Sequence, residues 1–591
     1  MSVSPPPHSA VPVPPPATTA DLAGPAAPAP PALAPPDAPG VTAAAPTPQA
    51  RGAEEAPAPH GGQAAALQDA AASLSPLAPL TVPVFRMLWL TWVAANTCMW
   101  MNDVAAAWLM TTLTTSPILV ALVQSASTLP VFLLGLPSGA LADILDRRRY
   151  FIATQFWVAA VAVVLALAIL AGGMTAPLLL ALTFANGIGL AMRWPVFAAI
   201  VPELVSRPQL PAALALNGVA MNASRIIGPL LAGAIIASAG SAWVFVLNAV
   251  LSVISGLVIM RWKRTHVPSP LGRERLGSAI RVGVQFVRQS PRMRAVLWRI
   301  SIFFLHATAL MALLPLLAKG LEGGGAGTFT LLLASMGAGA ITAAMFLPRL
   351  RQAMARDVLV MRGTMLQAAA TAVMAVAPNV YVAVPAMFVG GMAWITTANS
   401  LSVSAQLALP NWVRARGMSI YQMSIMGSTA LGAAVWGQVA TLTDVHTSLG
   451  VAATTGVVAM ALVQRLVADR SIEEDLSPSR AFKAPVAEAP PRAGHVVVTI
   501  EYFIDPARTD EFRTVMQESR RSRLRQGALG WQLLHDIGNP ARYVERIEDE
   551  SWTEHLRRFD RVTASDVALR ERKLAFHVGD APPRVTRWAV D

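Results

Sequence analysis

Charged side chains that interrupt long apolar runs are the residues of this sequence best placed to do chemistry. Asp103, preceded by Asn102, lies in the first such run, and Arg225 lies about half-way along the fifth. An ionised group at the centre of a membrane helix costs about 2.5–3.5 kcal/mol and is usually retained for a function. A carboxyl group can bind and release a proton there, and a guanidinium can pair with it or hold an anion. We expect Asp103 and Arg225 to form a proton-coupling pair; the alternative is a salt bridge that only packs helices.

Polar and aromatic side chains elsewhere in the apolar runs would line a cavity among the helices. Arg193, close to one end of its run, is expected to extend to the membrane interface instead. A lone histidine in an apolar helix is more often satisfied by a local partner than used in a proton relay, so His306 has a structural alternative. The expected cavity residues are Asn102, Gln124, Asn222, His306, Trp394, Asn399 and Gln422.

The elements that must position these residues are membrane spans. The chain has 591 residues, of which 54% are hydrophobic and only 14% are charged, whereas soluble proteins have roughly 25% charged residues. The apolar runs are each long enough to cross the hydrocarbon layer, which takes about 20 residues. We predict an all-α polytopic bundle with twelve spans near 86–111, 117–141, 149–172, 176–200, 212–238, 241–261, 295–318, 327–347, 358–377, 379–404, 416–441 and 447–468. Two pairs of runs are nearly continuous, so a cruder count gives ten or eleven.

Basic residues gather at every second connection between the predicted spans. They are Arg147 to Arg149, the cluster from Arg261 through Arg294, Arg349 through Arg356, and Arg414 with Arg416. The positive-inside rule then places both termini in the cytoplasm. The net charge of +12 lies largely in loops that meet anionic lipid, so it indicates membrane lipids as partners and not nucleic acid.

Composition divides the chain into six parts. These are a Pro/Ala-rich cytoplasmic tail expected to be disordered (1–82), a six-helix half (83–261), a linker (262–294), a second six-helix half (295–470), a further linker (471–494) and a cytoplasmic domain (495–591). Six and six spans are typical of two related bundles around a central path. Within the first linker, 273–290 carries apolar residues three or four apart among arginines and should lie along the membrane surface.

The last part, 495–591, has the composition of a soluble α+β domain. Its pattern predicts a strand at Val496–Phe503, a helix at Pro506–Arg525, strands at Gly530–Ile537 and Arg542–Glu548, helical stretches at 551–559 and 563–575, and a strand at 584–590. This order of strand, helix, two strands, helix and strand is that of a ferredoxin-like domain.

The string GALADILDRRR, from Gly139 to Arg149, follows the second predicted span. It resembles the loop signature G-x-L-A-D-R-x-G-R-R of the major facilitator superfamily, in which this loop latches the two halves. The resemblance implies a conformational latch made by Gly139, Asp143, Arg147 and Arg148. Ile144 and Asp146 depart from the pattern, and the alternative is that the arginines only set topology.

A second string places Gly228, Pro229 and Gly233 in the fifth span. It resembles the antiporter signature of drug and proton exchangers in the same superfamily, which implies export by proton antiport. Strings such as Val201-Pro202-Glu203-Leu204 and Leu214-Ala215-Leu216-Asn217 resemble the transmembrane secretion effectors, a bacterial branch that includes the enterobactin exporter. The resemblance implies a major facilitator fold of the bacterial inner membrane that exports a drug, siderophore or secondary metabolite.

The soluble domain resembles the antibiotic-biosynthesis-monooxygenase-like dimeric α/β barrels. The matching strings are Glu501-Tyr502, Gly530-Trp531, Arg542-Tyr543-Val544-Glu545 and Ser551-Trp552-x2-His555. The resemblance implies homodimerisation through this domain and a small ligand held near His535, Trp552 and His555. The favoured alternative is a packing module, because no nucleophile–base pair or metal-ligand spacing is evident.

The sequence also bears on the energy source. It has no phosphate-binding G-x-x-x-x-G-K-[ST] string and a single cysteine, Cys98, so we expect no bound cofactor or metal and a proton gradient as the driving force. The rival function is a membrane-tethered enzyme or ligand sensor whose activity resides in 495–591. Twelve spans are more than an anchor needs, which favours transport.

Overall fold

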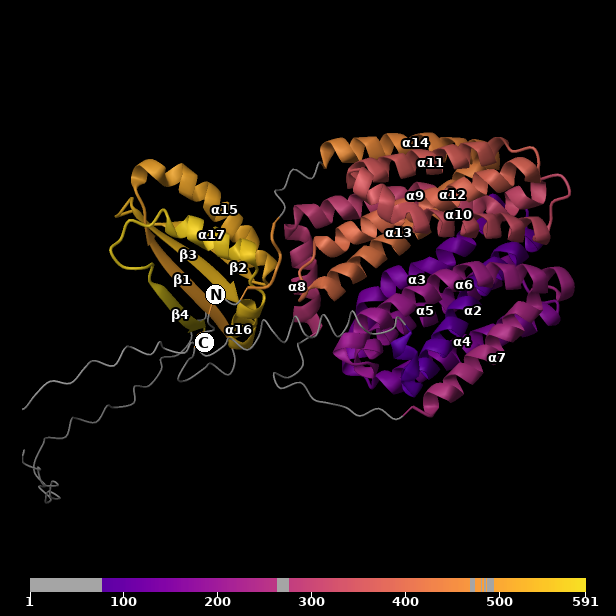
Figure 1. The fold of residues 1–591 in the computed structure, drawn as a ribbon, viewed down its shortest axis with the longest axis horizontal. Helices are drawn as coiled ribbons and strands as arrows, with labels where there is room; N and C mark the ends of the chain where they lie inside the picture. The colour runs from indigo at the N-terminus through magenta and orange to yellow at the C-terminus, as the bar shows by residue number, and fades with distance from the viewer. Residues whose placement is uncertain are drawn as a thin grey trace, which may run out of the picture. The chain divides into compact units, whose positions relative to one another are not determined.

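The computed structural model describes residues 77–262, 276–467, 474–479, 481–482, 485 and 494–590. Most of the predicted 1–82 tail lies outside these residues, and its end forms a short 3-10 helix, η1 (Ala78–Thr81). Long helices fill the predicted spans, and an α/β domain follows them (Figure 1).

The helices begin and end close to the predicted limits of the spans. In the first half they are α2 (Pro83–Leu113), α3 (Pro117–Ile144), α4 (Arg147–Leu170), α5 (Ala176–Leu204), α6 (Leu210–Ala239) and α7 (Ser241–Met260). In the second half they are α9 (Pro291–Gly320), α10 (Ala326–Ala353), α11 (Arg356–Val376), α12 (Val380–Leu407), α13 (Arg414–Leu442) and α14 (Val445–Leu466). Proline occupies the first turn of several of them, where a missing N–H costs no hydrogen bond.

Among the described residues, eleven helices are long and apolar enough to cross a membrane. Helix α2 is not one of them, although it is 31 residues long. Its buried polar residues, including Asn96 and Asn102, lower its hydropathy. The first predicted span is therefore a helix in the expected place, with an unusually polar interior.

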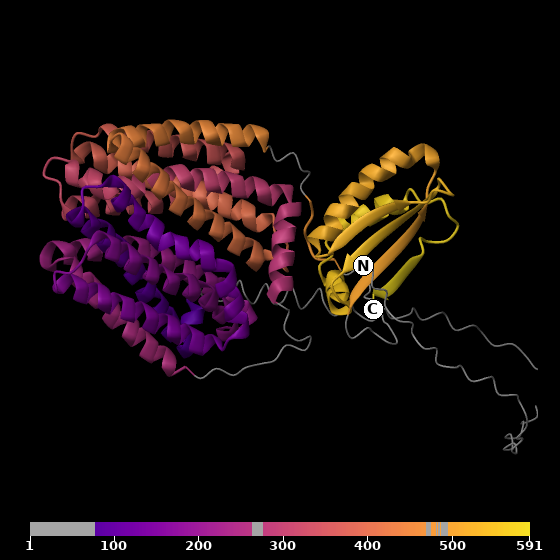
Figure 2. The ribbon, with the colours of Figure 1, turned by 180° about the vertical axis from the view of Figure 1, so that it is seen from behind.

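The helices of each group of six pack on one another, and fewer helix pairs join the two groups. Helices α2 to α7 contact one another in pairs such as α3 with α5 and α4 with α7, and α9 to α14 do so in pairs such as α10 with α12 and α9 with α13. The two groups meet mainly where α3 packs on α13 and α6 packs on α10. Seen from behind, the indigo-to-magenta and pink-to-orange helices form two adjoining layers (Figure 2).

Two glycines bring α10 and α12 into backbone contact. A Cβ on Gly339 of α10 would lie 1.9 Å from the carbonyl oxygen of Phe388, and a Cβ on Gly391 of α12 would lie 1.9 Å from that of Met336. Lipid supplies no hydrophobic force between helices, so membrane helices gain stability from close packing across small residues. The close packing of α10 on α12 therefore requires glycine at both positions.

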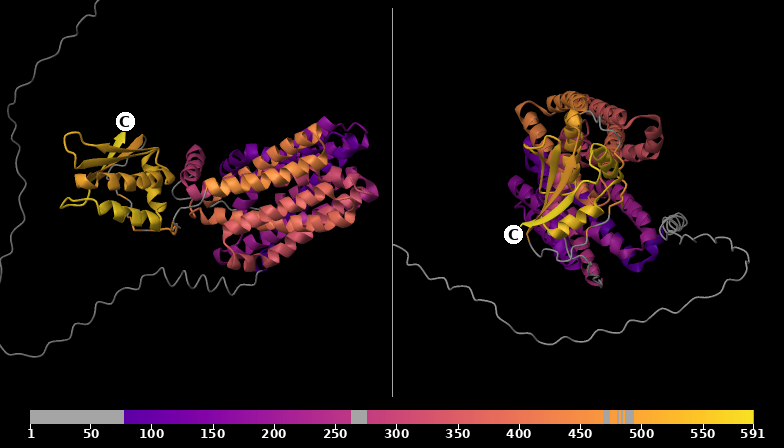
Figure 3. Two further views of the ribbon diagram at one scale, coloured as in Figure 1. Left: turned by 90° about the horizontal axis from the view of Figure 1, so that it is seen from above. Right: turned by 90° about the vertical axis from the view of Figure 1, so that its left-hand side faces the viewer.

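The α/β domain contains the strands and helices that the sequence pattern predicted, in the same order. They are β1 (His495–Phe503), η3 (Pro506–Arg508), α15 (Thr509–Arg525), β2 (Gly530–His535), β3 (Arg542–Asp549), α16 (Trp552–Asp560), α17 (Ala564–Leu574) and β4 (Val585–Val590). The sheet has the order β2-β3-β1-β4, and every neighbouring pair is antiparallel. Helices α15 and α17 cover one face (Figure 3), where Phe512 and Met516 pack on Tyr502 and Tyr543.

We expect Gly391→Val to destabilise the bundle by about 1–3 kcal/mol or more, the usual cost of overpacking. The new side chain would clash with the backbone carbonyl of Met336, which cannot rotate away as a side chain could. The apparent melting temperature of the detergent-solubilised protein should fall by several degrees. Gly327→Val in α10 is the matched control, since nothing lies within 4 Å of its Cβ position. Equal melting temperatures for the two variants would contradict the close contact.

Candidate functional site between the two halves

Arg225 lies on α6 between tryptophans from both halves. Its guanidinium carbon is 5.2 Å from the ring centre of Trp100 on α2 and 5.6 Å from that of Trp394 on α12. Within the part of the chain that the structure describes, it has no hydrogen bond or ion pair. Cation–π contacts stabilise a desolvated cation by about 2 kcal/mol but do not accept its N–H groups in the plane of the guanidinium. Arg225 is thus a cation at the contact of the halves with no protein anion to neutralise it.

The glycines of the second motif explain how Arg225 reaches this position. A Cβ on Gly228, one turn after Arg225, would lie 2.5 Å from Cβ of Trp100, so glycine here lets α6 lie against α2. A Cβ on Gly233 would lie 1.8 Å from the hydroxyl oxygen of Thr330 on α10, in the other half. Pro229 lies between them inside α6. Gly228 therefore allows close packing within the first half, and Gly233 allows close contact between the two halves.

Asp103 lies one turn beyond Trp100 on α2. It is partly buried, and no hydrogen bond or ion pair to it occurs among the described residues, so the expected pairing with Arg225 is not made in this conformation. Its neighbour Asn102 is buried, and its side-chain oxygen also has no hydrogen-bond partner there. The site therefore holds an acid and a base on adjacent helices that are both without a protein counter-ion.

The remaining predicted cavity residues lie on helices of both halves. Trp394 is buried against Phe303 and Phe304, at ring-centre distances of 6.0 and 5.0 Å. Gln124 on α3, Asn399 on α12 and Gln422 on α13 are partly buried. The side chain of Asn222 lies outside the described residues.

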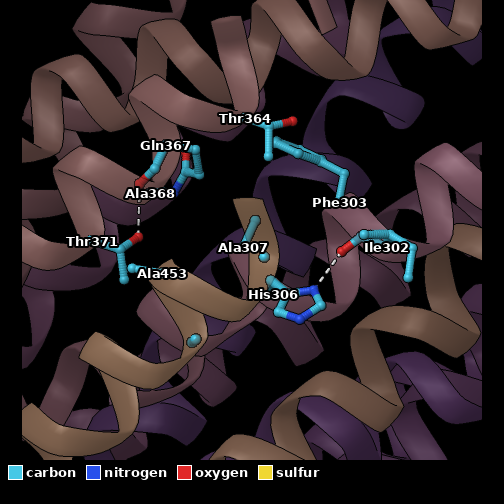
Figure 4. A pocket seen from close by; sticks show the side chains of 11 residues that line it. Ile302, Phe303, His306, Ala307, Thr364, Gln367, Ala368, Thr371 and Ala453 are labelled. Carbon is cyan, nitrogen blue, oxygen red and sulfur yellow. Dashed lines mark hydrogen bonds between the residues drawn. The ribbon is translucent and has the colours of Figure 1, made fainter. Parts of the chain in front are cut away.

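His306 lies inside the second half and not at the contact of the halves. Its Nδ1 is 2.8 Å from the carbonyl oxygen of Ile302, the local partner expected of a structural histidine. It lines a small, mainly apolar cavity to which Gln367 and Thr371 contribute polar atoms (Figure 4). The cavity measures about 20 Å³, which is room for about one water molecule, and the side-chain oxygen of Gln367 has no protein partner there.

The predicted latch is described only in part. The surroundings of Gly139 and the side chain of Asp143 lie outside the described residues. Arg148 donates a hydrogen bond to the carbonyl oxygen of Met260, which ties α4 to the end of α7 within the first half. Asp146, a departure from the family string, caps α4 by accepting a hydrogen bond from the backbone of Arg149 at 2.9 Å. In this conformation the hydrogen bond of Arg148 joins two helices of its own half.

Arg193 does not extend to the interface as expected, because it is only 2% exposed. Its guanidinium carbon lies 5.5 Å from the ring centre of Trp92, and one terminal nitrogen donates to the carbonyl oxygen of Ala95 at 3.4 Å. Trp92 stacks in turn on Phe197 at 3.9 Å. The position of Arg193 along its helix could not predict this burial, because the residues around its guanidinium come from both α2 and α5.

The three residues of the expected ligand pocket in the α/β domain do not come together. Trp552 and His555 are neighbours, with ring centres 5.4 Å apart, but His535 stacks on Tyr543 at 4.3 Å and is exposed at the end of β2. His555 is buried and lies 2.8 Å from a carboxylate oxygen of Asp549, which also accepts hydrogen bonds from Arg558 at 2.7 Å. Burial by itself raises the pKa of Asp549, but Arg558 and His555 outweigh burial and lower it.

A second buried network fills the space between the sheet and α15 and α17. Glu545 of β3 is fully buried and accepts hydrogen bonds from Tyr502 at 3.2 Å, Ser519 at 2.8 Å, Trp531 at 2.9 Å and Lys573 at 3.2 Å. Burial opposes the charge of Glu545, yet Lys573 and Arg523 with these hydrogen bonds hold its pKa well below the usual range. This network could not be predicted from the sequence, because its members are separated along the chain and meet only in the folded domain.

Comparison with known proteins places the whole described bundle and domain in one family. The family model described as "Transmembrane secretion effector" matches residues 74–590. The chain belongs to this family. Its members are transporters of the major facilitator superfamily and not enzymes, and the protein is accordingly a multi-pass membrane protein.

Among characterised relatives, this transporter is similar to the staphyloferrin A transporter of Staphylococcus aureus (strain NCTC 8325 / PS 47). The two are 24% identical over 258 residues, which cover 42% of this chain and 63% of the relative. The match thus spans less than two thirds of the relative's length. The family is shared, but the substrate does not follow from this match.

Solved transporters share the fold at low identity. A POT family transporter in complex with a thioalcohol-conjugated peptide is 12% identical with a TM-score of 0.54, covering 66% of this chain and 97% of that one. The nucleoside transporter NupG is 14% identical with a TM-score of 0.53, covering 65% and 99%. These similarities establish the major facilitator fold of the helical bundle.

The two halves of the transporter contact each other where α2 and α9 end and α3 begins. Lys319 at the end of α9 donates to the carbonyl oxygen of Thr111 at 2.9 Å, and the backbone of Ile118 donates to Thr441 at 3.1 Å. Trp108 stacks on Phe329 at 5.9 Å. Each contact joins one half to the other. Lys319 is a single basic residue between two predicted spans, and its position in the sequence does not reveal its contact with the other half.

We expect Glu545→Gln to destabilise the α/β domain by about 3–5 kcal/mol, because removing one partner leaves Lys573 as an unpaired buried charge. Hydrogen exchange of 495–590 in the full-length transporter measures the change. The double variant Glu545→Gln/Lys573→Met should be less destabilised than the single one, since it removes both charges. A single variant as stable as the wild type would contradict the role of the pair.

Proposed function

We propose that this transporter exports a small anionic molecule, of the siderophore or secondary-metabolite kind, by alternating access and proton antiport. The observation that carries the proposal is Arg225, a guanidinium placed between aromatic rings of both halves with no protein anion beside it. The name of the staphyloferrin A transporter supports a substrate of this class. The antiporter-like placement of Gly228, Pro229 and Gly233 supports export.

Arg225 would act as the anchor for the anionic group of the substrate. A desolvated guanidinium without a counter-ion is costly, and a ligand carboxylate or phenolate that accepts its N–H groups removes that cost. Trp100 and Trp394 come from different halves, so rocking of the halves changes what surrounds the cation. A ligand that binds better in one arrangement than in the other shifts the equilibrium between them.

Asp103 would carry the proton. No cation holds its carboxylate in the described structure, so the group can be neutral while the site is closed and can ionise once the site opens to water. A change in the charge of Asp103, one helical turn from Trp100, would alter the electrostatic potential at Arg225 on the adjacent helix. Substrate and proton would then compete through electrostatics, which is what exchange in opposite directions requires.

We further propose the bacterial inner membrane as the location, with both termini and the α/β domain on the cytoplasmic side. The arginines at the ends of α4, α9 and α11 on that side of the bundle support this orientation. The α/β domain is proposed to be ferredoxin-like and to pair with a second copy through the sheet face that α15 and α17 leave open, where Trp588 and Leu534 are exposed. The enzymatic alternative is not supported, because His535 lies apart from Trp552 and His555.

We expect Arg225→Ala to lower export of an anionic substrate at least about ten-fold, corresponding to about 1.4 kcal/mol of lost interaction. Arg225→Lys should retain part of the activity because it keeps the charge but loses the planar fork. Efflux from everted vesicles or proteoliposomes measures the effect. Arg288→Ala, an exposed arginine of the helix between the halves, is the matched control. Wild-type efflux by Arg225→Ala would overturn the anchoring role.

We expect Asp103→Asn to abolish the response of transport to an imposed pH gradient while leaving substrate binding within about three-fold. The amide cannot exchange a proton, so substrate addition should no longer release or take up protons in a weakly buffered vesicle suspension. Asp444→Asn is the control, because that carboxylate only caps α14. Proton flux that persists in Asp103→Asn would show that another group carries the proton.

A further inference from the structure

The helix between the two halves, α8 (Leu276–Gln289), contacts the α/β domain with one stripe of its surface. The terminal nitrogen of Arg281 lies 2.8 Å from a carboxylate oxygen of Glu550, and the hydroxyl of Ser278 donates to the same oxygen at 2.7 Å. Gln285 donates to the carbonyl oxygen of Ala528 at 2.7 Å. Residues three and four apart share one side of a helix. The segment that the sequence pattern placed along the membrane surface thus has a polar stripe in contact with the domain.

The neighbouring stripe of α8 is buried against the second half. Phe286 and Val287 are buried, and α8 packs on α9 and α13. Phe286 meets Trp412, in the connection between α12 and α13, edge to face at 5.7 Å. In the described part of the chain, the helices that α8 packs on in the bundle belong to the second half. The linker helix is therefore held between that half and the domain.

The domain also reaches the second half directly. The guanidinium carbon of Arg561 lies 5.3 Å from the ring centre of Trp412. Gly527, with φ +108°, lets the domain approach closely, since a Cβ there would lie 2.7 Å from Arg561 and 2.9 Å from Val282. Glycine adopts this left-handed conformation without strain. The contact thus has a packed centre around Val282, with the polar contacts of Arg281 and Gln285 beside it.

The segment that follows α14 also forms hydrogen bonds and an ion pair with the domain. The backbones of Ser479 and Val562 are joined by a hydrogen bond of 2.9 Å, and Ala564 donates to Ser477 at 3.0 Å. Arg525 forms an ion pair with Glu474. Because the chain connects α14 to the domain covalently, docking is intramolecular, and effective concentrations in the millimolar range make modest contacts persistent.

We propose that residues 495–590 form a permanent brace of the second half: the domain fixes α8 to α9, α13 and Trp412, and moves with that half as one body while the first half rocks. The surface that does this, the α8 seat, consists of Ser278, Arg281, Val282, Gln285 and Trp412. Each seat contact is individually weak, since the Arg281–Glu550 pair is partly exposed and such pairs contribute about 0–1 kcal/mol. The packed centre and the covalent connection together keep the seat closed. The inference concerns the motion of parts and does not depend on the identity of the substrate.

A cross-link across the seat tests the brace. In a Cys98→Ala background of the full chain, Ser278→Cys with Glu550→Cys should react with a short bifunctional thiol reagent to give an intramolecular link. The yield should be the same at rest and during transport driven by a pH gradient, and the linked protein should transport within about two-fold of the unlinked one. Ser278→Cys with Ile537→Cys is the control, because Ile537 is fully exposed beyond the far end of β2 and should not link.

Two results would overturn the brace. Linked protein that no longer transports would mean that the domain must leave α8 during the cycle. A yield no higher than that of the control pair would mean that the seat does not exist in the membrane. The yield needs no substrate, so a failure of the proposed export activity leaves this part of the test intact and distinguishable.

A charge exchange keeps the proposal testable if the cysteine pair fails to fold. Arg281→Glu should increase the rate of proteolysis between α14 and β1 several-fold, and Arg281→Glu/Glu550→Arg should restore resistance. Arg288→Glu, exposed on the same helix, should leave the rate unchanged. Equal proteolysis of wild type and Arg281→Glu, or failure of the exchange to restore resistance, would count against the seat.

Discussion

A charge inside a membrane bundle must find its partners among side chains and ligands, because no bulk water is there to solvate it. This constraint organises the centre of the transporter. Among the described residues, Arg225 contacts two tryptophan faces and no carboxylate, and Asp103 contacts no cation. In the proposed function these two unpaired groups on adjacent helices serve an anion and a proton.

Helix packing makes that arrangement possible. Where α6 lies against α2 and α10, glycines at 228 and 233 replace side chains that would push the helices apart. The same device joins α10 to α12 within the second half. In lipid the hydrophobic effect does not drive helices together, so the bundle gains stability from close approach of the helix backbones. The positions of small residues then decide which helix faces meet. The cation between the halves is a consequence of these contacts.

The α/β domain packs as soluble proteins do, with its buried charges paired. The α/β domain keeps Glu545 and Asp549 ionised while buried because Lys573, Arg523 and Arg558 surround them. Of the residues of the expected ligand pocket, His555 belongs to the network of Asp549. The domain also contacts α8 and Trp412, and these contacts are the basis of the proposed brace.

The sequence by itself determined which segments form helices and strands. Apolar runs of membrane length located the long helices, and the period-two pattern located β1 and β3, because both signals are local. It also identified Asp103 and Arg225, since a charge in an apolar run is costly wherever the helix packs. Only the tertiary structure decided what surrounds them: that Arg225 lies between Trp100 and Trp394, that Arg193 is buried on Trp92, that His306 lies within one half, and that α8 faces the domain as well as the bundle. Each of these depends on which faces of two distant segments meet, and that is settled by side-chain volume and close approach in three dimensions, which no local pattern encodes.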